Sequence, residues 1–105
     1  MATIETLRVV HFDALKNVLA VAAYPGEPTC VIVPFRSIIA EALRLGTVGL
    51  LLSHNHPSGD PEPSRADILA THALARVGEA LGISVHDHLV VGASSCVSFR
   101  DTGLL

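Results

Sequence analysis

Hydrophobic and polar positions alternate along this chain in a way that predicts several short strands. Residues 6–12 and 18–23 are apolar or β-branched runs joined by the segment 13–17, which predicts a β-hairpin. A turn rich in proline and glycine at 24–28 leads to a third predicted strand at 29–33. The first third of the chain is therefore expected to be β-structure.

Two segments instead have helical spacing. In residues 36–45 the apolar side chains recur at the spacing of a buried helical stripe, and Gly46 follows as a helix stop. Residues 64–81 carry a stripe of small and apolar side chains, and Gly82 marks the end. We expect both helices to pack on the sheet through these stripes.

Three further apolar runs, 48–52, 84–91 and 96–99, predict a buried strand between the helices and two strands after them. Strands interleaved with two helices predict a small α/β domain with a mixed sheet. A chain of 105 residues is enough for one domain with one core, spanning residues 1–105.

The segment 53–67, SHNHPSGDPEPSRAD, concentrates the candidate chemistry between a predicted strand and a predicted helix. His54 and His56 leave the strand at alternate positions, so both imidazoles can face one ion. Asp67 falls in the first turn of the helix and can add a carboxylate oxygen. Two nitrogens, one oxygen and a water suit catalytic zinc, and the prolines between them stiffen the loop.

Other interpretations of these residues remain open. Ser64 can be the N-cap of the helix, with Asp67 completing a capping box in a merely polar turn. Asp60 can orient a ligand imidazole or bind its own backbone as a turn aspartate. His86 and His88 repeat the spacing of the first pair, but no carboxylate follows them at helical spacing.

The segment HNHPSGDPEPSRAD, with its His-x-His, serine and aspartate, resembles the JAMM (MPN+/JAB) metalloprotease motif and very closely resembles its RadC branch. Residues 41–45, 87–92 and 98–100 also look like RadC, so the resemblance covers nearly the whole chain. It implies a JAB/MPN-like fold, cytidine-deaminase-like in outline. RadC proteins usually carry a helix-hairpin-helix segment ahead of this domain, which we do not expect here because the chain starts directly in the JAB part.

For the site, the resemblance implies one zinc ion held by His54, His56 and Asp67. It implies that the hydroxyl of Ser64 steadies an oxyanion. Asp87 and His88 would support the fold or the ligands near the site.

The same family has an upstream glutamate that acts as general base, expected on the strand before a glycine-containing turn. That strand, residues 18–23, holds no acid, and alanine or valine stands where the glutamate is expected. Glu27, just past Gly26, is the nearby substitute base.

These features predict a zinc metallohydrolase of peptide or isopeptide bonds, weakened by the missing base. One alternative is a non-catalytic zinc-binding scaffold. Another is a DNA-repair accessory, which the traditional name of the family suggests.

The composition of the chain limits the kinds of substrate and the cellular location that we expect. A net charge of −3 with scattered cations predicts no direct nucleic-acid binding, so we expect a peptide or protein substrate. The chain shows neither a signal peptide nor an apolar run of membrane-helix length. Cys30 and Cys96 lie in apolar, strand-like contexts, which predicts buried thiols and a cytoplasmic location.

Overall fold

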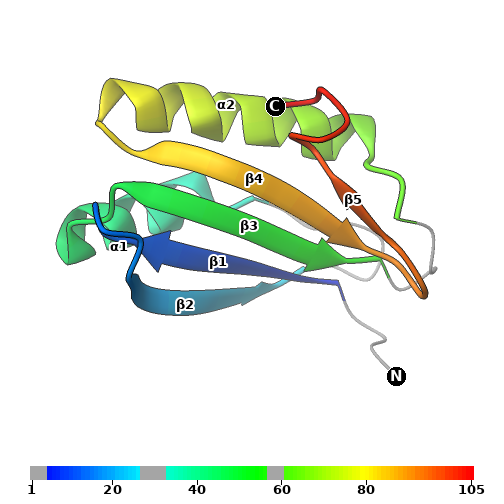
Figure 1. Ribbon diagram of the computed structural model, residues 1–105, viewed down its shortest axis with the longest axis horizontal. Coiled ribbons are helices and arrows are strands. Elements are labelled where there is room, and N and C mark those ends of the chain that lie inside the picture. The colour runs from blue at the N-terminus through cyan, green and yellow to red at the C-terminus, as the bar shows by residue number, and fades with distance from the viewer. Residues whose placement is uncertain (1–4, 27–32, 57–60) are drawn as a thin grey trace.

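A mixed five-stranded sheet forms one layer of the protein (Figure 1). The computed structural model describes residues 5–26, 33–56 and 61–105. Across the sheet the strand order is β2-β1-β3-β4-β5, with β3 and β4 parallel and the other neighbours antiparallel. The strands are β1 (Thr6–Phe12), β2 (Val18–Pro25), β3 (Gly49–Asn55), β4 (Ser84–Val91) and β5 (Cys96–Ser98).

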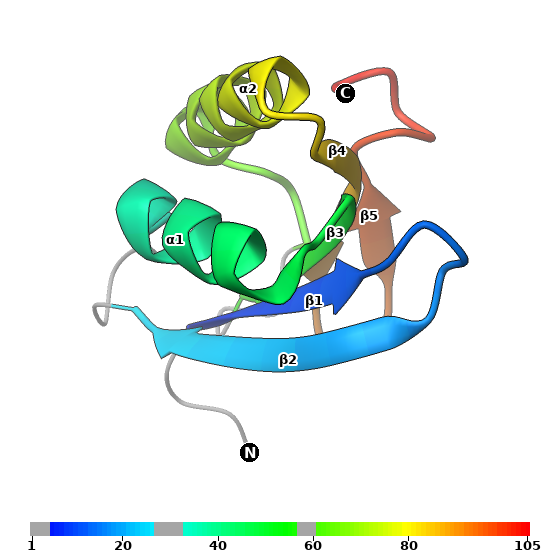
Figure 2. The ribbon, with the colours of Figure 1, turned by 90° about the vertical axis from the view of Figure 1, so that its left-hand side faces the viewer.

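The second layer consists of helices α1 (Phe35–Leu45) and α2 (Arg65–Ala80), which lie on the same face of the sheet (Figure 2). Alternate residues of each strand point to that face, because the side-chain period of a strand is two. The fully buried core joins strand and helix side chains: Leu7, Val9, Leu50, Leu52, Ile38, Ala42 and Leu74. The predicted small α/β domain with a mixed sheet and two helices is confirmed.

Most predicted elements are present with shifted ends. The hairpin of residues 6–12 and 18–23 is confirmed as β1 and β2. The predicted strand 48–52 continues through Asn55, so His54 lies within β3 rather than after it. Gly46 ends α1 with a positive φ of 74°, as its lack of a side chain allows. The predicted strand 29–33 falls almost entirely outside the described ranges.

A β-bulge in β4 separates His86 from His88, the pair that repeats the spacing of His54 and His56. The register runs from Leu50 opposite Val85 to Leu51 opposite Asp87, which leaves His86 as an extra residue. His86 therefore does not share a face with His88. It stacks on Phe12, with ring centroids 5.8 Å apart, and its imidazole occupies the space that a side chain at Gly49 would need.

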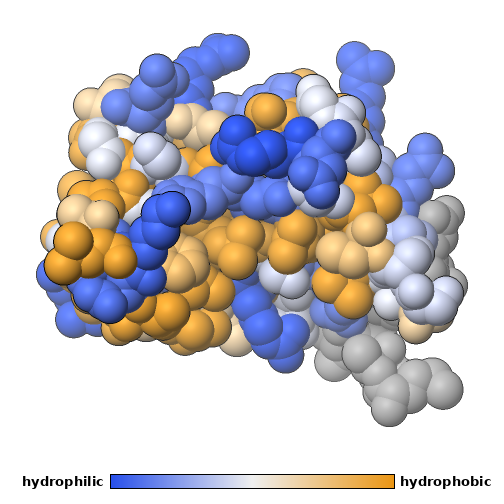
Figure 3. All heavy atoms as spheres, viewed as in Figure 1, coloured by the Kyte–Doolittle hydropathy of each residue, from blue (hydrophilic) through white to orange (hydrophobic). Residues whose placement is uncertain are grey.

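The opposite face of the sheet has no covering helix among the described elements. Figure 3 shows an apolar band running across the molecule in the same view as Figure 1. Val10 and Leu51 face each other across β1 and β3 on this side and are half-buried. On β2, Val21 is 59% exposed. The sheet is thus buried on one side and only partly shielded on the other.

The expectation of buried thiols is wrong for Cys96, which is exposed. The residue begins β5, a short strand at the edge of the sheet, which no further strand covers among the described residues. Cys30 lies outside the part of the chain that is described. Within that part, none of the helices is long and apolar enough to span a membrane.

Gly78 lies in α2 where the helix passes the chain that enters β4. A Cβ at this position would lie 2.6 Å from the carbonyl oxygen of Ile83. In an ordinary helix interior, replacing glycine by alanine stabilises by about 1 kcal/mol. We expect Gly78→Ala to destabilise instead, by about 1–3 kcal/mol, because backbone cannot yield as a side chain can.

Urea unfolding measures this effect. Ala73→Gly, at an exposed position of the same helix, is the matched control and should cost about 1 kcal/mol. A Gly78→Ala variant as stable as the parent, or more stable, would contradict the close approach.

His11 generates a prediction about pH. It is fully buried, and its Nδ1 lies 2.9 Å from the Thr47 hydroxyl. Burial lowers the pKa of His11 below its ordinary 6.5, while the charge of Glu41 partly opposes the shift. As the pH falls below 6.5, the unfolded chain therefore takes up this proton before the folded chain does.

The contribution of neutral His11 to the free energy of unfolding should thus be complete above pH 6.5. It should decline as the pH falls, by at most about 1.4 kcal/mol per pH unit. Denaturation at several pH values in the presence of a chelator measures this slope. His11→Gln, which cannot titrate, should show a shallower slope, and parallel slopes for the two proteins would refute the assignment.

Candidate metal centre

The C-terminal end of β3 brings two imidazoles together. The Nε2 atoms of His54 and His56 lie 2.8 Å apart. His54 is 1% exposed, whereas His56 is half-buried. The backbone N–H of His56 donates to the carbonyl of Val91 at 2.9 Å, which continues the pairing with β4 and fixes the direction of the side chain. The expected convergence of this pair is therefore present.

Asp67 approaches the pair from the first turn of α2. Its Oδ2 lies 3.5 Å from Nε2 of His54 and 3.6 Å from Nε2 of His56. The same oxygen accepts a hydrogen bond from the backbone N–H of Ser64, and the Ser64 hydroxyl oxygen accepts one from the N–H of Asp67, each at 3.0 Å. The carboxylate of Asp67 thus completes the capping box and also lies next to both histidines.

The ionised form of Asp67 is favoured. Burial alone would raise the pKa of this carboxyl, but the interactions with His54 and Ser64 outweigh burial and hold the pKa below its ordinary value. A carboxylate that stays ionised is the form that binds a metal cation.

Glu5, immediately before β1, completes the cluster. Its Oε1 lies 3.7 Å from Nε2 of His56, and donor atoms of Glu5, His54 and His56 all lie within 4.8 Å of one another. The residue is only 9% exposed. No hydrogen-bond partner for its Oε2 occurs in the described portion of the chain. A buried carboxylate oxygen without a partner is costly, so this position is suited to a polar ligand.

The backbone on both sides of Glu5 is fixed. Its carbonyl accepts from the N–H of Gly26 at 2.7 Å, and the N–H of Thr6 donates to the Asn55 side chain at 2.9 Å. In the antiparallel register Leu7 faces His54, so one same-face step further along β1 places Glu5 across from His56.

The position expected for the acid, on residues 18–23, therefore does not adjoin the histidines. Those residues form β2, which β1 separates from β3, so Ala22 and Ala23 lie one strand away from the histidines. Glu5 was missed because the pairing partner of β3 could not be read from the sequence. Glu27 and Asp60 lie in the undescribed gaps and stay predictions.

The donor set fits a divalent transition-metal ion. Ligand bonds of about 2.0–2.1 Å in a tetrahedral site place donor atoms about 3.3 Å apart. The distances from Asp67 Oδ2 to the two imidazoles, 3.5 and 3.6 Å, and from Glu5 Oε1 to His56, 3.7 Å, lie close to that spacing. The 2.8 Å separation of the two nitrogens would widen by about half an ångström around an ion.

Behind His54 lies His88 on β4, fully buried. Its Nε2 is 2.6 Å from Nδ1 of His54, and its Nδ1 is 2.6 Å from the Thr71 hydroxyl of α2. The ring stacks on Phe99, with centroids 4.5 Å apart. Burial, and then the charge of nearby His54, lowers the pKa of His88 to about 4, so the ring is neutral at pH 7.

Asp87, the neighbour of His88 in β4, bonds to β5 and the turn that follows it. Its carboxylate accepts hydrogen bonds from the Ser98 hydroxyl and from the backbone N–H groups of His88 and Arg100. These contacts tie β4 to the turn after β5. Asp87 therefore secures the strand that carries His88, while His88 itself contacts the cluster.

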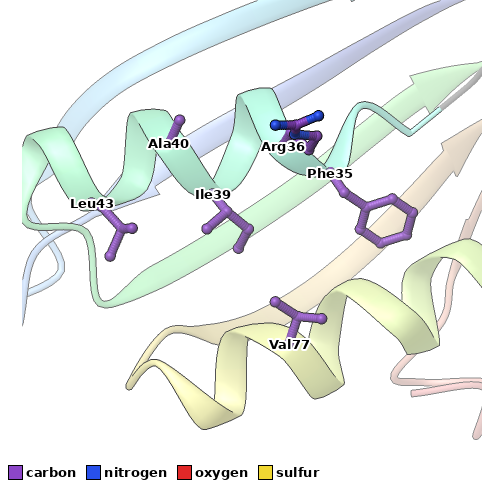
Figure 4. A pocket seen from close by; sticks show the side chains of 6 residues that line it. All are labelled: Phe35, Arg36, Ile39, Ala40, Leu43 and Val77. Carbon is purple, nitrogen blue, oxygen red and sulfur yellow. The ribbon is translucent and has the colours of Figure 1, made fainter.

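A separate concave feature lies between the two helices (Figure 4). It is an apolar groove of about 360 Å³, lined by Phe35, Arg36, Ile39, Ala40, Leu43 and Val77. None of these side chains belongs to the histidine and carboxylate cluster. The groove lacks paired acids or histidines in its lining, so the candidate chemistry of the described residues gathers at the end of β3.

The chain is similar in sequence to proteins of one family. The family model described as the RadC-like JAB domain matches residues 1–104. A UPF0758 protein of Rhodobacter capsulatus is 45% identical over 103 residues, which are 96% of this chain and 48% of that relative. A UPF0758 protein of Symbiobacterium thermophilum is 41% identical over 104 residues, covering 98% of this chain and 44% of the relative.

The chain thus spans about half the length of the curated relatives it matches. Because the match extends over nearly all of its residues, the chain belongs to the RadC-like JAB domain family.

Proposed function

We propose that this domain is a zinc-dependent hydrolase of peptide or isopeptide bonds. The observation that carries the proposal is the buried carboxylate of Glu5 beside the imidazole pair, with one oxygen lacking a partner among the described residues. A zinc-dependent hydrolase of this kind uses a metal ion and a general base beside it. The end of β3 and the start of β1 together offer these parts.

In this proposal His54, His56 and Asp67 hold the zinc ion. When bound, zinc supplies a Lewis acid that lowers the pKa of a water toward about 7 and polarises a carbonyl. The protein contributes the ligands in a largely preset arrangement, since the histidines lie in a strand and its extension and the aspartate lies in a capped helix.

Glu5 takes the role of general base. Its carboxylate would accept a proton from the attacking water and return it to the departing amine. Proton transfer by a positioned side chain is worth about 10²–10⁴-fold in rate. The near-complete burial of Glu5 strengthens its interaction with charges that develop beside it, because the local dielectric is low.

Ser64 would donate to the carbonyl oxygen as negative charge develops there. Its Oγ accepts a hydrogen bond from the N–H of Asp67, so the hydroxyl hydrogen can serve a ligand. Ser64 is exposed, and it caps the N-terminus of α2, where the helix dipole favours negative charge.

The proposal also covers the substrate class. A net charge of −3 supplies little of the phosphate neutralisation on which nucleic-acid affinity depends. We therefore propose a peptide or protein substrate. The scaffold alternative rested on the missing acid, and a carboxylate within 4 Å of His56 removes that reason.

The first prediction from this proposal concerns the metal. Elemental analysis of the purified chain should find about one zinc ion per molecule, as expected for three protein ligands around one ion. His56→Ala and Asp67→Asn should each lose most of the metal. His86→Ala is the control, because His86 stacks on Phe12 away from the cluster. Equal zinc in His56→Ala and the parent would refute the site.

The second prediction separates a base from a ligand. Glu5→Gln should keep zinc but lower hydrolysis of a fluorogenic peptide or a ubiquitin-like conjugate by about 10²–10⁴-fold. Glu79→Gln, on the exposed side of α2, should leave the rate unchanged. Loss of zinc in Glu5→Gln would make Glu5 a ligand. A loss of rate in Glu27→Gln but not in Glu5→Gln would assign the base to Glu27.

A further inference from the structure

Three buried side chains form a continuous hydrogen-bonded row beneath the candidate metal centre. The row runs from Nδ1 of His54 to Nε2 of His88, and from Nδ1 of His88 to the hydroxyl of Thr71. Both contacts measure 2.6 Å, and the three residues are at most 1% exposed. The row therefore connects β3, β4 and α2 through groups that water does not reach.

Such a row can carry its protons in only two directions. Each gap holds one hydrogen, and a neutral imidazole has a single N–H. Either His54 donates from Nδ1 and His88 donates onward to Thr71, or Thr71 donates inward and the order reverses. The reversed order places a hydrogen on Nε2 of His54, the atom that faces His56 and Asp67.

Metal binding would require the first direction, because only then does Nε2 of His54 keep the lone pair that a ligand must offer. Thr71 stands in the middle of α2 and is fully buried, so water does not offer its hydroxyl another partner. Its oxygen then accepts from His88, and the other nitrogen of His88 accepts from His54.

We propose that His88 and Thr71 are positioning residues that hold His54 in its Nδ1–H form and aim the free Nε2 lone pair at the ion. For the identity of that ion the inference rests on the proposed function. The stacking of His88 on Phe99, with ring planes 20° apart, fixes the plane of the relaying imidazole. A metal-ligating histidine commonly gives its other N–H to a carboxylate or carbonyl, and here a second imidazole takes that part.

The fold contains a matched control for this row. His11 and Thr47 form another fully buried contact between a histidine Nδ1 and a threonine hydroxyl, at 2.9 Å. It lies toward the opposite end of β1 from Glu5 and does not involve the cluster. Removing either hydroxyl deletes the same chemistry, but only Thr71 is linked to His54.

Zinc affinity, measured by competition with a chromogenic chelator, tests whether His88 and Thr71 position His54. Thr71→Val should weaken zinc binding by about 10–100-fold, the usual effect of losing a partner that orients a ligand. Thr71→Ser restores the hydroxyl and should recover most of the affinity. Thr47→Val should leave it unchanged. Equal affinity of Thr71→Val and the parent would overturn the proposal.

Nitrogen-15 NMR of the imidazole rings gives a second readout that does not depend on any variant folding. In the zinc-loaded parent, His54 and His88 should both be Nδ1–H tautomers, and an Nε2–H tautomer at His88 would overturn the relay. If the parent binds no zinc, the proposed function fails. The relay is then judged in the metal-free protein, where Nδ1–H at both rings supports it and Nε2–H at either refutes it.

Discussion

The antiparallel pairing of β1 with β3 is the constraint on which the candidate site depends. It places Leu7 opposite His54 and, by the pleat, Glu5 across from His56. A slip of one residue would turn every side chain of β1 to the other face and remove both the core contacts of Leu7 and the carboxylate from the cluster. Core packing and site chemistry are therefore fixed by the same register, since the buried face of β1 serves both.

Much of the fold follows from local pattern. Apolar periodicity is enough to place both helices and the five strands of the described sheet, and the spacing of His54, His56 and Asp67 is enough to bring them together. These features are local because each depends on residues within one strand, one helix or one connecting loop. The capping box of Ser64 and Asp67 was likewise readable, and it proved compatible with the approach of the carboxylate to the imidazoles.

The remaining features depend on which strands become neighbours. Glu5 is separated from His56 by half the chain, and only the placement of β1 between β2 and β3 joins them. The bulge at His86 reverses the expected alternation of β4, so that His88 alone turns toward His54. Pairwise spacing along one strand cannot reveal an extra residue in its ladder. Cys96 is exposed because β5 is an edge strand, again a property of the assembled sheet.

The Oδ2 atom of Asp67 caps α2 and also lies within 3.6 Å of both imidazoles. These two roles of Asp67 determine whether folding would precede metal binding. Zinc fingers acquire their shape together with the ion, so that removing it unfolds them. Here the carboxylate is already held by the cap of its own helix, and that helix packs on a sheet through a buried hydrophobic core. If the proposed site holds an ion, the polypeptide would therefore fold first and bind the ion afterwards, and removing the ion would leave the folded site intact.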